Sequence, residues 1–568
     1  MNGEVLVLLD TDRIKDYVFA TNKLREIRGA SAILDELNLK STFQLLACKF
    51  GDGNYYYDKV DDEWKHNSQT ICGNKIDWEV IFLGGGSGKI IFAEEGKAEK
   101  FCQTIQEMYR KETDGAASIT AVCVSRLDCE SFQHWVYRGE KELRKQKDSK
   151  YLRLQPLTNP YFKICESTGL LPAEKNDFGE MISMASFDKR QGSKKVRSYF
   201  VQFKKWLEKQ QNEEFKSNWE KVIKTPFRDN EVNEEWENLL PEDLNTIGDL
   251  SNGYVGFIYA DGNRMGMRLI ELAESEDTGK YREFSDKVKL GNQNALFNAL
   301  AGKLKNINKE HIPFEILLLG GDDLMVVVPA NKAVEIARNF CEDFKSRTLY
   351  KDGSNEDTNV SICAGVLITH ANYPIHRMMD HAEELLKSAK ELSYNKYREA
   401  KDAGKSKKDW EVNAIDFMVL KGSLLQDLKE MRRNELSYHS DSRIGGDPDL
   451  ILYQRPYTIA QLDELICWIR RFKRSNFPHN KLKSMYESLY RGKGQAMLDY
   501  LLITSRLPQS SDNGESPKKI MLDFKHKWEG GIELFPWKTK VSGKCVTPFI
   551  DLIELYDFIE KEQEAQSE

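Results

Sequence analysis

The segment Phe314-Glu315-Ile316-Leu317-Leu318-Leu319-Gly320-Gly321-Asp322-Asp323-Leu324-Met325-Val326-Val327-Val328 is the clearest indicator of the fold. Two apolar runs of strand length flank the four central residues, which predicts a β-hairpin with Gly320-Gly321-Asp322-Asp323 at its tip. The glycines supply the positive φ that a tight turn needs. Two adjacent aspartates are hard oxygen ligands that suit Mg²⁺ or Mn²⁺, especially when substrate phosphates complete the shell. Taken alone, the same residues are equally compatible with a solvated turn.

The hairpin lies inside a βαββαβ pattern with a trailing helix, which predicts a ferredoxin-like palm. The expected elements are a strand over 254–259 that leads to Asp261, a helix over about 284–307, the hairpin, a helix over about 333–344, a strand over 360–367 and a helix around 382–390.

The N-terminal region repeats this order. A strand over 4–9 leads to Asp10, and a second predicted hairpin has the tip Gly84-Gly85-Gly86-Ser87. The sequence therefore predicts two palms. Because Gly86 and Ser87 stand where the other tip has Asp322 and Asp323, we expect only the second palm to bind two metal ions through carboxylates.

These patterns predict an α+β protein with two ferredoxin-like, nucleotidyl cyclase-like palm domains, a helical middle domain and a C-terminal helical bundle. The expected boundaries are 1–126 for the first, degenerate palm, 127–251 for the middle domain, 252–422 for the second palm and 423–568 for the C-terminal domain. Apolar residues at helical spacing after residue 460 are interpreted as bundle core.

Composition narrows the class of protein. The 568 residues carry a formal net charge of −7, which is no global signal for nucleic acid, although the segment 470–493 is strongly basic. The ten cysteines form no C-x-x-C pair, which favours a reducing cytoplasm and argues against a cysteine-rich zinc site. No leader or long apolar run is apparent, so we expect a cytoplasmic protein without a membrane partner.

The carboxylates indicate a reaction class. In a ferredoxin-like sheet the strand that leads to Asp261 lies beside the hairpin, so Asp261 is expected to face Asp322 and Asp323. Three converging carboxylates raise one another's pKa values, and two divalent ions offset that repulsion, as in two-metal nucleotidyl transfer. Lys387 and Lys390 share one helix face and can neutralise a triphosphate, although their spacing alone is typical of a solvated face.

The sequence also resembles a known family, the large polymerase-like subunit of type III CRISPR effector complexes. The resemblance rests on motifs spread over nearly the whole chain. They are Asp16-Tyr17-Val18-Phe19-Ala20-Thr21, Leu24-Arg25-Glu26-Ile27-Arg28-Gly29-Ala30-Ser31, Ala260-Asp261-Gly262-Asn263-Arg264-Met265-Gly266, the Gly320–Asp323 tip, Gly365 with His370 and Pro374, Ala382 with Leu385-Leu386-Lys387 and Ala389-Lys390, and Phe477-Pro478 with Lys481-Leu482.

The resemblance implies an ATP-dependent nucleotidyltransferase that is switched on when CRISPR RNA, held with other subunits of the complex, pairs with target RNA. The usual product is cyclic oligoadenylate for antiviral signalling, and some members instead join AMP to S-adenosylmethionine. The expected metal-binding and catalytic residues are Asp261, Asp322 and Asp323. The expected nucleotide contacts are Gly320, Gly321, Lys387 and Lys390 for the donor, and Ser31, Gly85 and Gly86 for the acceptor.

Three departures from the family pattern lead to further expectations. Many members have an N-terminal HD nuclease domain that cuts single-stranded DNA, but this sequence opens on the first palm and has no His followed by Asp, so we expect no DNA cleavage. Cys165 has no cysteine partner at zinc-site spacing, so zinc is not expected. Asn263 replaces the second acidic residue of the family's DGD motif, and we expect activity to survive this change.

Three alternative functions remain open from the sequence. A free-standing diguanylate cyclase has a Gly-Gly-Asp/Glu-Glu-Phe tip, whereas Leu324 follows Asp323 here and a second palm is present. A catalytically inactive scaffold subunit is disfavoured by the three intact aspartates. A template-copying polymerase would need fingers-like and thumb-like domains, which the sequence does not indicate.

Overall fold

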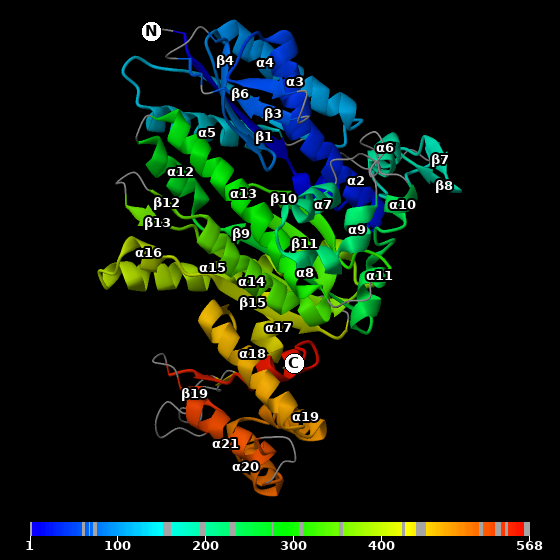
Figure 1. Cartoon of the computed structure of the whole chain (residues 1–568), viewed down its shortest axis with the longest axis vertical. Coiled ribbons are helices and arrows are strands. Elements are labelled where there is room, and N and C mark those ends of the chain that lie inside the picture. The colour runs from blue at the N-terminus through cyan, green and yellow to red at the C-terminus, as the bar shows by residue number, and fades with distance from the viewer. Residues whose placement is uncertain are drawn as a thin grey trace.

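The fold was described from a computed structural model of the whole chain. The residues it describes are 3–58, 63–67, 69–71, 76–150, 161–192, 199–225, 234–274, 277–305, 310–351, 356–422, 427–438, 450–509, 515–528, 535–539 and 543–561. Figure 1 shows three tiers along the longest axis: an N-terminal sheet with its helices, a central sheet with its helices, and a C-terminal group of helices. The predicted α+β class with two palms is confirmed.

The first palm contains a four-stranded antiparallel sheet in the order β4-β5-β1-β6. Its elements are β1 (Val5–Asp12), α1 (Ile14–Val18), α2 (Leu24–Asp35), the π-helix Glu36–Ser41, α3 (Thr42–Lys49), β2 (Tyr55–Asp58), β3 (Glu63–His66), β4 (Trp78–Gly84), β5 (Ser87–Phe92), α4 (Glu95–Glu112), β6 (Ser118–Ser125) and α5 (Phe132–Ser149). The hairpin of β2 and β3 was not predicted, because its four-residue strands carry no clear apolar alternation.

The second palm contains a six-stranded sheet in the order β10-β11-β9-β14-β15-β18. Its elements are β9 (Tyr254–Gly262), α12 (Met265–Ala273), α13 (Thr278–Lys303), β10 (Glu315–Gly320), β11 (Asp323–Pro329), α14 (Ala330–Arg347), β12 (Tyr350–Lys351), β13 (Asp357–Thr358), β14 (Ile362–His370), α15 (Ile375–Asp402), α16 (Lys407–Trp410), β15 (Ala414–Leu420) and β18 (Tyr457–Thr458). The sequence did not predict β15, which runs parallel to β14, or β18 at the edge of the sheet.

Helices cover both faces of this sheet. Successive residues of a strand point to opposite faces, and the central strand β9 shows which helix lies on which side. A Cβ atom on Gly256 would lie 2.2 Å from the Cβ of Ala333 in α14. The neighbouring strand β14 pairs Gly365 with Tyr259, and a Cβ on Gly365 would lie 2.3 Å from the backbone oxygen of Ala382 in α15. The face that carries Tyr259 and Asp261 is therefore the α15 face.

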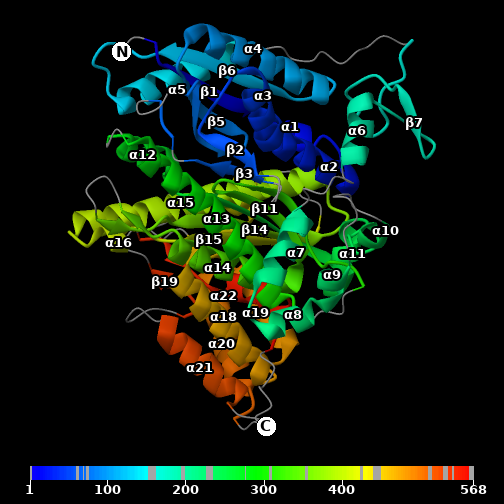
Figure 2. The ribbon, with the colours of Figure 1, turned by 45° about the horizontal axis from the view of Figure 1, so that its top comes forward.

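The middle region connects the palms and is partly helical, as expected. Figure 2 shows α6 and the β7–β8 hairpin beside α2, while α7 to α11 lie along the second palm. Its elements are β7 (Lys175–Asp177), β8 (Glu180–Ile182), α6 (Met184–Gly192), α7 (Tyr199–Lys209), α8 (Glu213–Asn218), α9 (Glu220–Lys224), α10 (Glu234–Glu237), α11 (Leu244–Gly248) and the 3-10 helix Asp249–Ser251. The predicted domain boundaries remain predictions.

Helix α2 joins the first palm to both neighbouring regions. On one side the buried Glu26 pairs with Arg190 of α6 at 2.8 Å. On the other side Arg28 donates from Nε and a terminal nitrogen to Glu315 of β10, at 3.1 and 2.5 Å. At Gly29, one turn after Glu26, α2 crosses α6 so closely that a Cβ there would lie 1.6 Å from the backbone oxygen of Lys189. The Leu24–Ser31 motif, on which part of the family resemblance rests, therefore links the first palm to both the middle region and the second palm.

The C-terminal region is mainly helical, as predicted. Of the residues interpreted as bundle core, Tyr486 is half-buried, and the others are buried: Leu462, Leu465, Ile466, Ile469, Leu482, Met485 and Leu489. The helices are α17 (Leu428–Glu435), α18 (Ile459–Arg474), α19 (His479–Leu489), α20 (Lys493–Arg506), α21 (Pro517–Trp528) and α22 (Phe549–Tyr556). A small sheet was not predicted because its strands are only two residues long. It has the order β16 (Ser437–Tyr438), β17 (Leu450–Ile451), β20 (Cys545–Val546) and β19 (Lys538–Thr539).

We predict that Gly29→Ala lowers the stability of the protein. The added methyl group has no space between α2 and α6, and overpacking of this kind costs about 1–3 kcal/mol. The thermal unfolding midpoint of the purified full chain should fall accordingly.

Gly96→Ala is the matched control, because Gly96 lies in the first turn of α4 and a Cβ there meets nothing within 4 Å. Alanine is a better helix former than glycine, so this variant should be neutral or up to about 1 kcal/mol more stable. Equal midpoints for Gly29→Ala and the unchanged protein would contradict the close crossing.

Candidate active site

The second palm brings the three predicted aspartates together. Asp323 pairs with Gly320 across the hairpin, and the next residue, Leu324, pairs with Ala260 of β9. This register places Asp261 beside the tip, as the sequence predicted. Its carboxyl group lies close enough to those of Asp322 and Asp323 to raise the pKa of each.

The three carboxylates oppose one another's ionisation. Burial and then the negative charge of Asp261 raise the pKa of Asp322 to about 7. Burial and the charges of Asp261 and Asp322 raise the pKa of Asp323 well above its usual range. The pKa of Tyr259, two residues before Asp261 on β9, is also raised, first by burial and then by this group of carboxylates. The cluster therefore has an excess of negative charge that a cation would relieve.

A lysine supplies part of that positive charge. Lys390 of α15 forms an ion pair with Asp261 and also donates to the backbone oxygen of Gly262 at 3.3 Å. Among the described residues, no group of three or more His, Cys, Asp or Glu side chains is spaced to enclose a metal ion. The donor chemistry nevertheless fits Mg²⁺ or Mn²⁺, because the cluster consists of hard carboxylate oxygens. Metal binding at Asp261 would compete with the ammonium group of Lys390.

An asparagine that the sequence analysis missed supports the hairpin tip. Asn292 of α13 is buried, and its Nδ2 donates to the backbone oxygens of Gly321 at 3.0 Å and Asp323 at 3.1 Å. The turn itself needs a glycine at position 321, where φ is +57°. The available signal was that Asn292 fills the position between Val288 and Leu296 in the apolar helical spacing of this segment.

The tips of the two palm hairpins meet each other. A Cβ on Gly320 would lie 3.1 Å from the Cα of Gly85, and φ is +59° at Gly85 and +83° at Gly86. A Cβ on Gly86 would lie 2.4 Å from the side chain of Ile14. Gly85 and Gly86 therefore form a turn that abuts the Gly320–Asp323 tip, and a contact of either residue with a nucleotide stays a prediction.

The first palm retains part of the same arrangement. Asp10 pairs with Ser87 of β5 and forms an ion pair with Lys147 of α5, the helix that follows β6. Asp261 and Lys390 occupy the corresponding positions of the second palm, since α15 follows β14. Burial raises the pKa of Asp10, although Lys147 opposes that shift. One carboxylate–lysine pair thus occurs in both palms, whereas the acidic tip occurs only in the second.

Two predicted nucleotide contacts lie in unexpected places. Ser31 is buried in α2, and its hydroxyl donates to the backbone oxygen of Leu317 in β10 at 2.5 Å, so it joins the palms. Lys387 is 70% exposed and pairs with Glu383 one turn earlier on α15 at 3.0 Å. Neither residue touches the aspartates in this state, and their roles toward a nucleotide stay predictions.

Asn263 does not take the position of a metal ligand. Its side chain is buried, and Nδ2 donates to Ser361 Oγ at 2.9 Å and Ser393 Oγ at 3.1 Å, and lies 3.4 Å from Cys363 Sγ. These contacts hold β9 against β14 and α15. In this chain the residue at position 263, which is acidic in the family's motif, therefore has a structural role.

Cys165 is buried beside the β7–β8 hairpin, with Sγ 3.5 Å from Ser186 Oγ. Burial acts to raise its pKa, but hydrogen bonds to Ser186 and Thr168 lower the pKa to about 6. No cysteine partner lies beside it among the described residues, and the expectation that zinc does not bind here stays an expectation.

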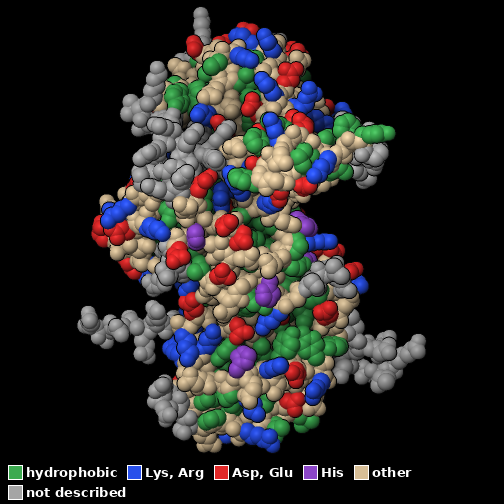
Figure 3. Space-filling view, turned by 90° about the vertical axis from the view of Figure 1, so that its right-hand side faces the viewer, with side chains coloured by type: hydrophobic (Ala, Val, Ile, Leu, Met, Phe, Trp, Pro, Cys, Tyr) green, Lys and Arg blue, Asp and Glu red, His purple; other side chains and the backbone are tan. Residues whose placement is uncertain are grey.

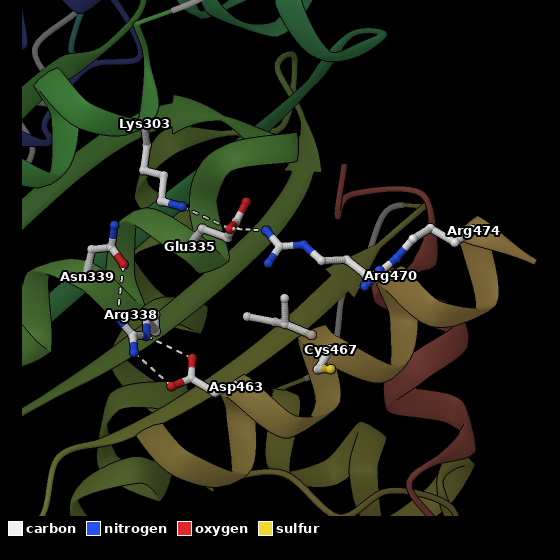
Figure 4. A pocket seen from close by; sticks show the side chains of 9 residues that line it. Lys303, Glu335, Arg338, Asn339, Asp463, Cys467, Arg470 and Arg474 are labelled. Atoms are coloured by element: carbon white, nitrogen blue, oxygen red, sulfur yellow. Dashed lines mark hydrogen bonds and ion pairs between the residues drawn. The ribbon is translucent and has the colours of Figure 1, made fainter. Parts of the chain in front are cut away.

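A separate cavity of about 320 Å³ lies between α14 and α18 (Figure 4). Ion pairs line it, with Arg338 bound to Asp463 through two contacts of 2.8 Å and Glu335 bound to Lys303 at 3.0 Å and to Arg470 at 2.6 Å. The pairs of Arg338 with Asp463 and of Glu335 with Arg470 fasten α18 to the second palm. Part of the basic segment 470–493 is therefore paired within the chain, and Figure 3 shows interspersed charges of both signs on one side of the molecule.

Comparison with known proteins agrees with this site. Residues 254–399 match the family model described as Cas10/Cmr2, second palm domain. This part of the chain is a palm of the Cas10/Cmr2 second-palm type, which confirms the predicted resemblance for the second palm. No curated protein matches the sequence. No helix in the described part of the chain is long and apolar enough to cross a membrane.

Three solved structures share the fold over 98% of this chain, each with 14% sequence identity. They are Csm1-Csm4 cassettes in complex with cA3, with pppApApA and with one ATP, and their TM-scores are 0.54, 0.52 and 0.51. This chain covers 70%, 69% and 70% of those chains, and 65% of a further cassette chain in complex with cA4. The chain thus spans about two thirds of the length of these relatives, and at this identity the likeness shows the fold.

We predict that Asn263→Asp destabilises the protein without increasing metal-dependent activity. The hydroxyl groups of Ser361 and Ser393 already donate to Glu411 at 2.6 Å and to the backbone oxygen of Val412 at 2.6 Å. A carboxylate at position 263 would therefore face acceptors, which costs about 1–3 kcal/mol. Urea unfolding measures the loss.

Asn212→Asp is the matched control, because Asn212 caps α8 with its Oδ1 and aspartate caps equally well. That variant should unfold within about 0.5 kcal/mol of the unchanged protein. If Asn263→Asp were neutral and raised turnover, position 263 would reach the metal site after all.

Proposed function

We propose that this chain is an ATP-dependent nucleotidyltransferase and the large subunit of a type III CRISPR effector complex. The observation that carries the proposal is the cluster of Asp261 on β9, Asp322 in the hairpin turn and Asp323 on β11, with Lys390 beside it and the glycine tip of the first palm against it. A half-buried acidic cluster with raised pKa values is costly to fold, which favours a role in cation binding.

The proposed reaction is an in-line displacement at the α-phosphorus of ATP. The oxygen of an acceptor hydroxyl forms a bond to that phosphorus, the bond to the bridging oxygen of the β-phosphate breaks, pyrophosphate leaves and the hydroxyl proton is released. Asp261, Asp322 and Asp323 would hold two Mg²⁺ or Mn²⁺ ions, which activate the hydroxyl and stabilise the leaving group.

The remaining residues position the donor nucleotide. An added Cβ at Gly321 would meet nothing within 4 Å, so the backbone there is accessible for close approach of the nucleotide, and Gly320 shapes this seat through its contact with Gly85. The ammonium group of Lys390 lies at the cluster and neutralises charge on the triphosphate, and Lys387 lies one turn earlier on the same helix. Since both lysines are paired with carboxylates of the chain, nucleotide phosphates would replace Asp261 and Glu383 as their partners.

The first palm would hold the acceptor opposite this site. Support comes from the meeting of the two tips, which places Gly85 next to Gly320, with Gly86 following in the same turn. Ser31 acts in this proposal through its bond to Leu317, because that contact fixes β10 and thereby the tip.

The proposed product is cyclic oligoadenylate, and the proposed partners are other subunits of the complex, CRISPR RNA and target RNA. Support comes from the Cas10/Cmr2-type second palm and from the solved cassettes of similar fold, which are Csm1-Csm4 assemblies with cA3, pppApApA and ATP. Mass spectrometry of products made by the assembled complex with target RNA, Mg²⁺ or Mn²⁺ and ATP tests this directly. The same reaction with S-adenosylmethionine added reveals whether an adduct with AMP forms instead.

We predict that Asp322→Ala together with Asp323→Ala abolishes product formation, with a loss of at least about a thousandfold, because the metal ions lose two of their three carboxylates. Assembly and target RNA binding should remain. The unfolding midpoint should not fall, since the substitutions remove repulsion within the cluster.

Asp343→Ala is the control, because this aspartate lies on α14, where it pairs with Arg347 at 2.9 Å and takes no part in the cluster. Product formation by that variant should match the unchanged complex. Undiminished turnover in the double variant would refute the assignment of the catalytic centre.

A further inference from the structure

Lys15 crosses from the first palm to the candidate site of the second. It lies on α1, and its ammonium group is 2.7 Å from Oε2 of Glu383 on α15. The same group lies over the ring of Tyr259 on β9, 4.9 Å from the ring centroid. The two residues of the ion pair are 368 positions apart in the sequence, so no local pattern predicts the contact.

This contact lies on the same face of the sheet as the aspartates. Tyr259 and Asp261 are two residues apart on β9, and residues at that spacing share a face. Glu383, Lys387 and Lys390 share a face of α15 because they are four and three residues apart. A rise of 1.5 Å per residue places Glu383 about 10 Å along the helix from Lys390, which binds Asp261. Lys15 therefore lies on the side of the sheet that carries the aspartates, where phosphates extending from them along α15 would approach it.

The charge immediately around Glu383 favours an anion. Lys387 binds Oε1 of Glu383 at 3.0 Å while Lys15 binds Oε2, so two ammonium groups share one carboxylate and one positive charge is left over. Burial acts to raise the pKa of Glu383, but hydrogen bonds to Lys15 and Lys387 outweigh it and lower the pKa, which keeps the carboxylate charged. The side chain of Lys15 is 35% exposed and accessible to a ligand.

We propose that Lys15 binds the phosphate chain of a nucleotide seated between the palms, and that Glu383 holds the ammonium group in place until the phosphates arrive. This inference rests on the proposed function and adds a residue of the first palm to the site. The rival interpretation is an ion pair that only fastens the palms together, and partly exposed pairs of that kind contribute little to stability.

The test compares ligands with and without phosphates. Binding of AMPPNP and of adenosine to the purified full chain is measured by calorimetry with Mg²⁺, for the unchanged protein, Lys15→Ala and Lys15→Arg. Lys15→Ala should weaken AMPPNP binding about tenfold, as expected for a lost charge-assisted hydrogen bond, and leave adenosine binding unchanged. Lys15→Arg should restore most of the AMPPNP affinity, and Glu383→Gln should not weaken it.

Lys145→Ala is the matched control, because Lys145 also pairs with a glutamate, Glu142 at 3.5 Å, but lies 76% exposed on α5. It should leave both ligands unaffected. A further arm compares AMPPNP with a linear diadenylate that carries a 5′-triphosphate. A larger loss for the diadenylate assigns Lys15 to the acceptor, a larger loss for AMPPNP assigns it to the donor, and either outcome supports a phosphate contact.

Two outcomes overturn the inference while the proposed function stands. One is unchanged AMPPNP affinity in Lys15→Ala, and the other is an equal loss for AMPPNP and adenosine, which indicates a structural role. If the unchanged protein binds no AMPPNP at all, the proposed function fails and the inference fails with it.

Discussion

The backbone contact between Gly85 and Gly320 sets the distance between the two palms. A Cβ on Gly320 would lie 3.1 Å from the Cα of Gly85, so the tips touch without intervening side chains. This close approach brings the first palm near enough for Lys15 to reach α15 and for Ser31 to reach β10. A bulkier residue at either tip would push the palms apart. The contacts of Lys15 and Ser31 with the second palm would then be lost or strained.

The two palms share an architecture but differ in charge. Each has an aspartate near the end of its first strand, held by a lysine from the helix after its fourth strand: Asp10 with Lys147, and Asp261 with Lys390. The second palm adds two further carboxylates at its hairpin tip, and only there does one lysine face three of them. One aspartate paired with one lysine has no net charge. The two additional aspartates of the second palm give that site a negative charge, which divalent cations would neutralise.

Much of this arrangement was predictable from local patterns, because strands and the hairpin tip follow from apolar runs and turn residues. The position of Asp261 followed from the pairing order of a ferredoxin-like sheet. Contacts between segments that are distant in the sequence correspond to no local sequence pattern and could not be predicted. Asn292, which supports the hairpin tip, and Lys15, which reaches the second palm, are single polar residues in helices without a distinctive pattern. The structural role of Asn263 becomes visible only when its hydrogen-bond partners are known. The two-residue strands of the C-terminal sheet are too short to show the alternation of apolar and polar residues that predicts a strand.

Helix α2 connects this site to the middle region. Two contacts from α2 hold β10, the ion pair of Arg28 with Glu315 and the hydrogen bond of Ser31 to Leu317, and β10 ends at Gly320. The opposite side of α2 is bound to α6 through Glu26 and Arg190. Buried ion pairs recover little net stability against the cost of desolvation, but they penalise any arrangement in which a partner is lost. The position of the acidic tip is therefore tied, through one helix and one strand, to the packing of α6, and a shift of α6 along α2 would have to break a buried pair or move the tip.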